Sequence, residues 1–238
     1  MLPHTNEFNT GHRKRLRRRL LHYGGSSLQK YEKLELLLTY AIPRRDVKPL
    51  AKHLLNKFET FQNLMNATPE ELCSIPGISE NSAALIILIR ELCCAYLEEK
   101  LPDRDIIKCT GEIIDFARMK IGGQHKEIFM LIFLNSRNQM LNYKCYPHGT
   151  IDHTTVYARE IVEDCLANKA RSVIMLHNHP SGLCLPSEED NKTTVRVIRA
   201  LSAVGITLFD HIIITGDSYH SMFSNNEFPS VPIKIKSE

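Results

Sequence analysis

Long apolar segments are absent from this sequence. No run of about 18 or more uncharged apolar residues occurs, so no transmembrane helix is expected. The first residues, MLPHTNEFNTGHRKRLRRRLL, carry charge but contain neither an apolar core nor a small-residue cleavage site. We therefore expect no signal peptide and no membrane partner.

Paired cysteines are lacking too. The seven cysteines are odd in number and scattered, and none forms a C-x-x-C pair: Cys73, Cys93, Cys94, Cys109, Cys145, Cys165 and Cys184. Several have apolar neighbours, which is typical of buried free thiols. This pattern predicts a reducing, cytoplasmic environment.

Acidic residues are scarce only at the front of the chain. Residues 1–57 hold 13 Lys or Arg and 4 Asp or Glu, whereas the remaining residues hold 17 and 23. The positive charge is densest within residues 10–20. It predicts contact with a polyanion such as DNA, although a solvated helix face gives the same pattern.

The first half of the chain is expected to form a small all-α domain, residues 1–100. Ser27 is a candidate N-cap for a helix that stops at Pro43, and another helix is expected from about Asp46 to Phe58. Thr68 and Glu71 form a capping box. The polar segment 97–108 is expected to be a linker.

The segment TPEELCSIPGISENSAALIILIRELCCAYL, residues 68–97, resembles a helix-hairpin-helix element. Its loop, residues 75–79, is of the kind that presents backbone N–H groups to a DNA phosphate. The family pattern usually ends this loop in Gly, but Ser79 stands here. A compact helical hairpin that only packs is the competing interpretation.

The second half, residues 105–238, changes its periodicity. Apolar runs at 127–135, 138–149, 172–179 and 206–215 indicate strands, with helices expected at 111–122, from Thr154 or Thr155 to about Asn168, and from Ser187 to near Gly205. The order αββαβαββ predicts an α/β domain with one mixed β-sheet flanked by helices.

The stretch HNHPSGLCLPSEED, residues 177–190, is the candidate site. His177 and His179 project from the same face of a strand because they are two residues apart. With Asp190 they offer two imidazoles and one carboxylate, which suit one Zn²⁺ per chain. A capping box formed by Ser187 and Asp190 is the structural alternative.

The spacing H-x-H-x7-S-x2-D, read as His177, His179, Ser187 and Asp190, is that of the JAMM metalloprotease signature. The stretch 148–182 and DHIIIT, residues 210–215, are similar to the RadC family of bacterial JAMM/MPN proteins. The helical front also resembles the RadC N-terminal region. The resemblance implies a domain of cytidine-deaminase-like architecture that cleaves amide bonds in a protein or peptide; eukaryotic relatives cleave isopeptide bonds to ubiquitin.

The same resemblance assigns two catalytic residues. Glu127, on the strand KEIFMLIFLN, corresponds to the Glu that activates the attacking water and protonates the leaving amine. Ser187 corresponds to the residue that stabilises the oxyanion.

Other residues and functions compete with this reading. Cys184 could complete a His/His/Cys ligand set, but it is expected to be a loop residue because the JAMM spacing already supplies a third ligand. His211 is expected to lie in the core or behind the ligands, and Arg159 to bind substrate or stabilise the fold. A zinc deaminase would need H-x-E and P-C-x-x-C, which are absent. A nuclease would need more carboxylates. A DNA-associated module with a vestigial or structural metal site is the alternative from a different functional class.

Overall fold

The computed structural model describes residues 6–101, 105–106, 108, 110–146 and 154–228. The chain divides into two compact units, Met1–Glu91 and Leu92–Glu238. Each unit is described by itself.

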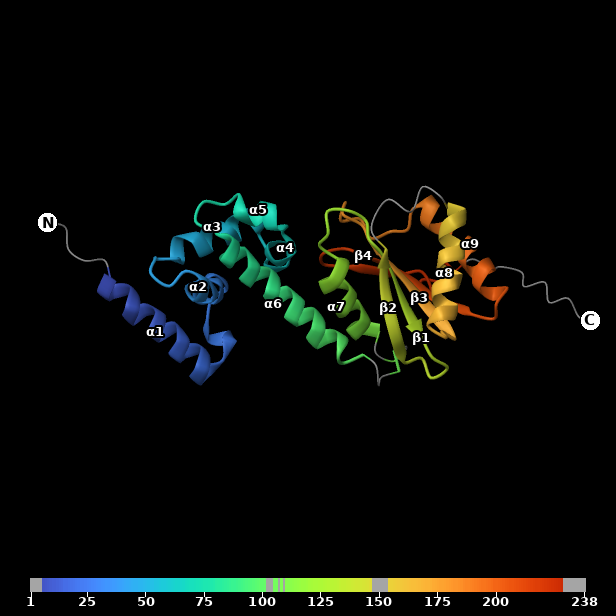
Figure 1. The fold of residues 1–238 in the computed structure, drawn as a ribbon, viewed down its shortest axis with the longest axis horizontal. Helices are drawn as coiled ribbons and strands as arrows, with labels where there is room; N and C mark the ends of the chain where they lie inside the picture. The colour runs from blue at the N-terminus through green and yellow to red at the C-terminus, as the bar shows by residue number, and fades with distance from the viewer. Residues whose placement is uncertain (1–5, 102–104, 107, 109, 147–153, 229–238) are drawn as a thin grey trace, which may run out of the picture. The chain divides into compact units, whose positions relative to one another are not determined.

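The first unit is helical throughout (Figure 1). Its elements are α1 (Asn6–Tyr23), a 3₁₀ turn (Gly25–Ser27), α2 (Lys30–Ala41), α3 (Lys48–Phe58), α4 (Phe61–Asn66), α5 (Pro69–Cys73) and the start of α6 (Glu80–Glu98). Leu38, Leu54 and Leu72 are fully buried in its core. Burying such a side chain contributes about 1.5–3 kcal/mol, which is why these short helices hold together.

Of the two N-caps predicted in this unit, one is confirmed and one is wrong. Thr68 and Glu71 form the expected capping box on α5. The cap predicted at Ser27 is wrong. Gln29 is the N-cap of α2, and it forms a capping box with Glu32. Ser27 instead ends the preceding 3₁₀ turn and bonds back to Gly24 and Arg19.

The second unit contains a five-stranded sheet in the order β2-β1-β3-β4-β5. Its elements are α7 (Thr110–Ile121), β1 (Phe129–Leu134), β2 (Met140–Tyr146), α8 (Thr154–Ala167), β3 (Ser172–Asn178), α9 (Glu188–Ser202), β4 (Thr207–Ile214) and β5 (Tyr219–Ser221). Within this sheet β3 and β4 are parallel, and the other three neighbouring pairs are antiparallel. The predicted αββαβαββ order and mixed sheet are confirmed. Thr154 and Thr155, the predicted caps of α8, lie at its start, but their side chains are not among those that the structure describes.

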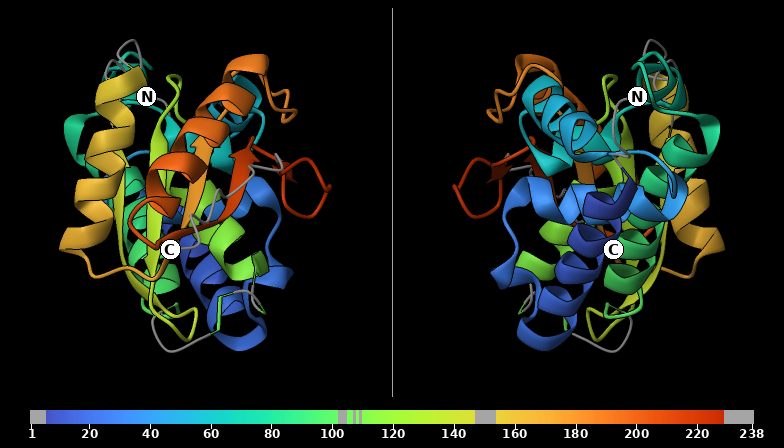
Figure 2. Two further views of the ribbon diagram at one scale, coloured as in Figure 1. Left: turned by 90° about the vertical axis from the view of Figure 1, so that its right-hand side faces the viewer. Right: turned by 90° about the vertical axis from the view of Figure 1, so that its left-hand side faces the viewer.

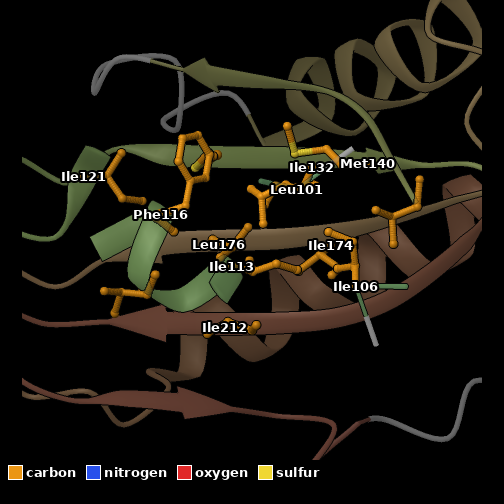
Figure 3. Packing of buried hydrophobic residues seen from close by; sticks show 14 residues of the cluster. Leu101, Ile106, Ile113, Phe116, Ile121, Ile132, Met140, Ile174, Leu176 and Ile212 are labelled. Atoms are coloured by element: carbon orange, nitrogen blue, oxygen red, sulfur yellow. The ribbon is translucent and has the colours of Figure 1, made fainter. Parts of the chain in front are cut away.

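Helices cover both faces of this sheet. α7 lies on one face, whereas α8 and α9, yellow and orange in Figure 2, lie on the other. β1 and β3 are buried along their whole length because both of their faces are covered. On the α7 side, Ile113 lies beside Ile174 and Leu176 of β3 (Figure 3). The Phe116 ring meets that of Tyr143 of β2 edge to face, with 5.1 Å between centroids.

The segment expected as a linker contributes to this core. Leu101 and Ile106 are buried among the residues of α7 and the sheet (Figure 3). In the part of the chain that the structure describes, no helix is both long and apolar enough to cross a membrane.

Candidate metal centre

The carboxyl end of β3, the central strand, carries the candidate histidines. Along β3, Val173 and Met175 face α8 and α9, and the alternation of a strand places His177 on the same face. The backbone N–H of His179 donates to Ile214 at 2.9 Å, which keeps the chain extended for one more residue. Both imidazoles therefore leave the sheet on the same side.

His177, His179 and Asp190 form the cluster that the sequence predicted. Their ligand atoms lie within 4.8 Å of one another. The two Nε2 atoms are 2.9 Å apart, and Asp190 oxygens lie 3.2 Å from His177 Nε2 and 3.5 Å from His179 Nε2. Ligand atoms bound to one zinc ion at 2.0–2.1 Å would be about 3.3 Å apart in a tetrahedron. The three side chains thus fit a single metal ion.

A relay of hydrogen bonds determines which nitrogen of His177 carries its proton. The Thr194 hydroxyl donates to the Asp190 carbonyl at 2.6 Å, so its oxygen accepts the N–H of His211 Nδ1, also at 2.6 Å. His211 is buried, and burial lowers its pKa and keeps it neutral. Its Nε2 then accepts the Nδ1–H of His177 at 2.9 Å. The lone pair of His177 is left on Nε2.

His179 is held in the same tautomer. Its Nδ1 donates to the Leu183 carbonyl at 2.7 Å, which leaves the lone pair on Nε2. The turn that brings Leu183 there includes Gly182, whose φ of 81° lies in the left-handed region that favours glycine. Two imidazole lone pairs and a carboxylate therefore converge with no proton assigned between them. A bound cation would relieve that repulsion.

Asp190 acts both as a member of this cluster and as a helix cap. Its carboxylate accepts the backbone N–H of Ser187 at 2.7 Å and the Ser187 hydroxyl at 2.6 Å, in the capping box of α9. Burial raises the pKa of the Asp190 carboxyl. When no metal is bound and His177 is protonated, its hydrogen bond and charge, together with the bonds from Ser187, outweigh burial and hold that pKa well below its usual range. The group is a carboxylate at neutral pH, as a metal ligand must be.

Glu127 lines the same cavity as the cluster. The cavity has a volume of about 570 Å³, and His177, His179, Ser187 and Asp190 also line it. Glu127 lies two residues before Phe129, which pairs with His177 across β1 and β3. Glu127 itself precedes β1, so the predicted strand starts two residues later than expected, and Glu127 reaches the cavity from the segment that leads into β1.

Three other residues weighed from the sequence do not belong to the cluster. Cys184 is on the loop and lies 3.4 Å from the Ser218 hydroxyl. His211 is buried behind His177, as expected. Arg159 is exposed on α8 and pairs with Glu163 at 2.8 Å.

Sequence reasoning missed Thr194. It lies one helical turn after Asp190, and its contact with His211 depends on the packing of α9 against β4. Spacing within α9 could have indicated its bond to Asp190, but nothing local indicates its bond to a histidine on another strand.

A mixed sheet between helices, with two histidines at the end of its central strand and an aspartate from the next helix, is the arrangement of a JAB, or MPN, domain. The family model described as "RadC-like JAB domain" matches residues 107–227, and the model "UPF0758 N-terminal" matches residues 9–84. The chain belongs to the RadC-like JAB domain family, with a UPF0758-type N-terminal region.

Curated relatives match along most of their length. UPF0758 protein FN0909 of Fusobacterium nucleatum is 39% identical over 220 residues, covering 90% of this chain and 95% of that protein. UPF0758 protein PSHAa2643 of Pseudoalteromonas translucida is 34% identical over 204 residues, covering 86% and 91%. UPF0758 protein SPO0054 of Ruegeria pomeroyi is 35% identical over 203 residues, covering 85% and 91%.

Proposed function

We propose that this chain is a zinc-dependent hydrolase that cleaves amide bonds in a protein or peptide substrate. The observation that carries the proposal is the convergence of two imidazole lone pairs and the Asp190 carboxylate in a cavity that Glu127 also lines. Two neutral histidines and one carboxylate are a donor set that zinc hydrolases use, and they leave the fourth tetrahedral position open. When bound, zinc would polarise the scissile carbonyl and lower the pKa of water.

Glu127 would act as the general base. Its half-buried carboxylate faces the cavity at the histidine end of the sheet, where it can accept a proton from the attacking water. The same carboxyl group would then deliver that proton to the leaving amine. One residue thus serves both halves of the reaction.

Ser187 would stabilise the oxyanion. In the structure its hydroxyl donates to Asp190 at 2.6 Å, and its oxygen accepts the Asp190 backbone N–H at 3.1 Å. A turn of the hydroxyl about its C–O bond would redirect the proton to negative charge developing on a substrate oxygen. The backbone N–H of Ser187 would keep the cap bond to Asp190 meanwhile.

The rest of the cavity favours a polypeptide substrate over a phosphodiester. Leu183 and Leu185 expose 61% and 55% of their surface beside the cluster, and both line the cavity. Such apolar walls suit peptide side chains. The cluster holds a single carboxylate, whereas phosphodiester hydrolysis usually draws on several around hard cations.

A screen of peptide and isopeptide substrates with zinc-loaded protein tests the proposal. We expect release of a new amine, detected by mass spectrometry, and its loss when zinc is removed by a chelator. Hydrolysis that persists in metal-free protein would contradict it.

Thr194 offers a test of the hydrogen-bond relay. We expect Thr194→Val to weaken zinc binding by about 10–100-fold, because residues that orient a metal-bound histidine typically contribute that much. The valine cannot accept the N–H of His211, so nothing fixes the tautomer of His177. Competition with a zinc-binding dye measures the affinity.

Thr194→Ser is the matched control, because serine keeps the hydroxyl and should bind zinc as the wild type does. Equal affinity in Thr194→Val and wild type would rule out the relay. A loss in Thr194→Ser without a loss in Thr194→Val would show that packing of the methyl group, rather than the hydroxyl, matters.

We also infer that the protein works in the cytoplasm. None of the six cysteines among the described residues forms a disulfide bond. Burial raises the pKa of the Cys145 thiol and, as the largest cause, raises that of Cys165 to about 12, so these thiols resist oxidation.

A second candidate function is DNA binding through α1. It would make the chain a DNA-binding module, whether or not the metal centre is also an active site. Lys14, Arg15, Arg17 and Arg18 are exposed on α1. Arg13 and Arg19 differ from them, because Arg13 bonds to backbone carbonyls, including that of Ile42, and Arg19 pairs with Glu32. Four cations of the basic cluster are thus presented to solvent, where they would meet phosphates.

The loop 75–79 offers less support for DNA contact than α1 does. Gly77 has a φ of 97°, as a tight turn requires, but the Arg45 side chain lies against it. The backbone N–H of Ser79 donates to the Ser82 hydroxyl at 3.3 Å. This N–H is therefore already paired within the protein.

Replacing the four exposed cations of α1 with Gln should lower the affinity for DNA and make that affinity less dependent on salt concentration. Each phosphate contact removed should lower the slope of log K against log salt by about 0.9. Fluorescence anisotropy with duplex and branched DNA measures both. The full-length protein is used.

The control variant removes four charges from the surface of α2 and α3: Lys30, Lys33, Lys52 and Lys57, each to Gln. An equal loss of affinity in this variant would mean that net charge, rather than α1, holds the DNA. Absence of salt-sensitive binding by the wild type would end the DNA proposal.

A further inference from the structure

The segment that carries Glu127 is tied to one buried side chain. Asn178 accepts the backbone N–H of Ile128 through Oδ1 at 2.6 Å. Its Nδ2 donates to the carbonyls of Gln124 at 3.1 Å and Lys126 at 3.0 Å. Three bonds from one amide therefore fasten the backbone on both sides of Glu127.

β3 places this clamp on the face opposite to the metal cluster. Asn178 lies between His177 and His179, and neighbouring residues of a strand point to opposite faces. The β1–β3 ladder ends at the pair of Phe129 with His177. Beyond that pair, the Asn178 side chain, rather than a backbone carbonyl, accepts the N–H of Ile128. The segment that leads into β1 is therefore held in place where backbone pairing has ended.

The contacts require an amide. A primary amide offers one acceptor and two donors in one plane, and here the acceptor and both donors are used. Leucine has a similar shape but offers none of them. Asn178 is 0% exposed, so water cannot replace the lost bonds without entering the core.

We propose that Asn178 is a positioning residue for Glu127. By holding the backbone of residues 124–128, it sets the distance between the Glu127 carboxylate and the metal cluster. This inference rests on the proposed function, since it assigns Asn178 a role in proton transfer by Glu127. The H-x-H segment thus has two roles in this proposal: its outer residues bind the metal, and its middle residue positions the base.

Kinetics of Asn178→Leu test the inference. A misplacement of about 1 Å typically costs about 100-fold in rate, so we expect kcat to fall by roughly 10–100-fold. KM should change by less than about threefold and zinc should stay at one per chain, because neither the cavity walls nor the ligands are altered. Loss of zinc would overturn the inference, since Asn178 would then act on the ligands.

A double variant separates positioning from general damage. Once Glu127→Gln has removed the base, Asn178→Leu should cause no further loss of kcat, because residues that act as a unit are not additive. An additive loss would overturn the inference. Ser172→Ala is the control, as it removes a buried hydroxyl from the far end of β3 and should leave kcat unchanged.

Hydrogen exchange provides a readout that does not depend on turnover. In zinc-loaded Asn178→Leu, amides of residues 122–128 should exchange faster than in the wild type, whereas those of residues 172–177 should not. Unchanged exchange at 122–128 would overturn the inference whether or not a substrate is hydrolysed. If the wild type hydrolyses nothing while exchange at 122–128 still rises, the clamp stands and the proposed function fails.

Discussion

Glu127→Gln is expected to lower kcat for amide hydrolysis by about 100- to 10,000-fold, the contribution typical of a general base. Glutamine keeps the shape of the side chain but cannot accept a proton from water or pass it to the leaving amine. Because Glu127 lines the cavity without belonging to the metal cluster, zinc should remain at one per chain. Steady-state kinetics and metal analysis of the same preparation measure both.

The control for this variant is Glu163→Gln on α8. Glu163 is exposed and pairs with Arg159, so its replacement should leave kcat unaltered. Wild-type turnover in Glu127→Gln would remove Glu127 from the mechanism. A loss of zinc together with turnover would assign Glu127 to metal binding instead.

The second large effect is expected on stability. Zinc that binds the folded protein at 1,000 times its dissociation constant should stabilise it by about 4 kcal/mol. For a protein of this size, each kcal/mol raises the melting temperature by about 2–4 °C. We expect the joint replacement His177→Ala/His179→Ala to abolish this zinc-dependent rise, because it removes two of the three ligands and both imidazole lone pairs.

The matched control is His22→Ala/His53→Ala. Both histidines are exposed in the helical unit, far along the chain from the cluster. Zinc should stabilise this variant as it does the wild type. An equal rise in the cluster variant would mean that zinc acts elsewhere on the protein. Scanning calorimetry with and without zinc gives the comparison.

The order of elements could be predicted because each has a strong local signal. Apolar runs such as FMLIFL and SVIMLHN indicated strands that both faces of a sheet bury, and β1 and β3 are buried along their length. The linker was harder to predict. Leu101 and the pair Ile106-Ile107 stand among polar residues without a helix or strand period, so nothing local shows that Leu101 and Ile106 enter the core.

The cluster itself could be predicted from spacing. His177 and His179 share a face because a strand alternates, and one capping box brings Asp190 back at the start of α9. From the sequence, a helix-capping role and a metal-binding role were alternatives for Asp190. The structure shows that the carboxylate caps α9 with one oxygen and reaches both histidines.

The roles of Thr194 and Asn178 could not be predicted. Thr194 meets His211 only because β4 lies parallel to β3 with α9 packed against it. Asn178 meets Gln124 and Lys126 across more than 50 positions of sequence. Such contacts depend on strand pairing over long separations, which periodicity does not encode.

The most direct test of the metal centre is the metal content of purified protein, measured by mass spectrometry beside His177→Ala/His179→Ala after zinc has been offered to both. We predict one zinc per chain in the wild type and none in the double variant. A folded wild type that holds no zinc, or a double variant that retains it, would contradict the account.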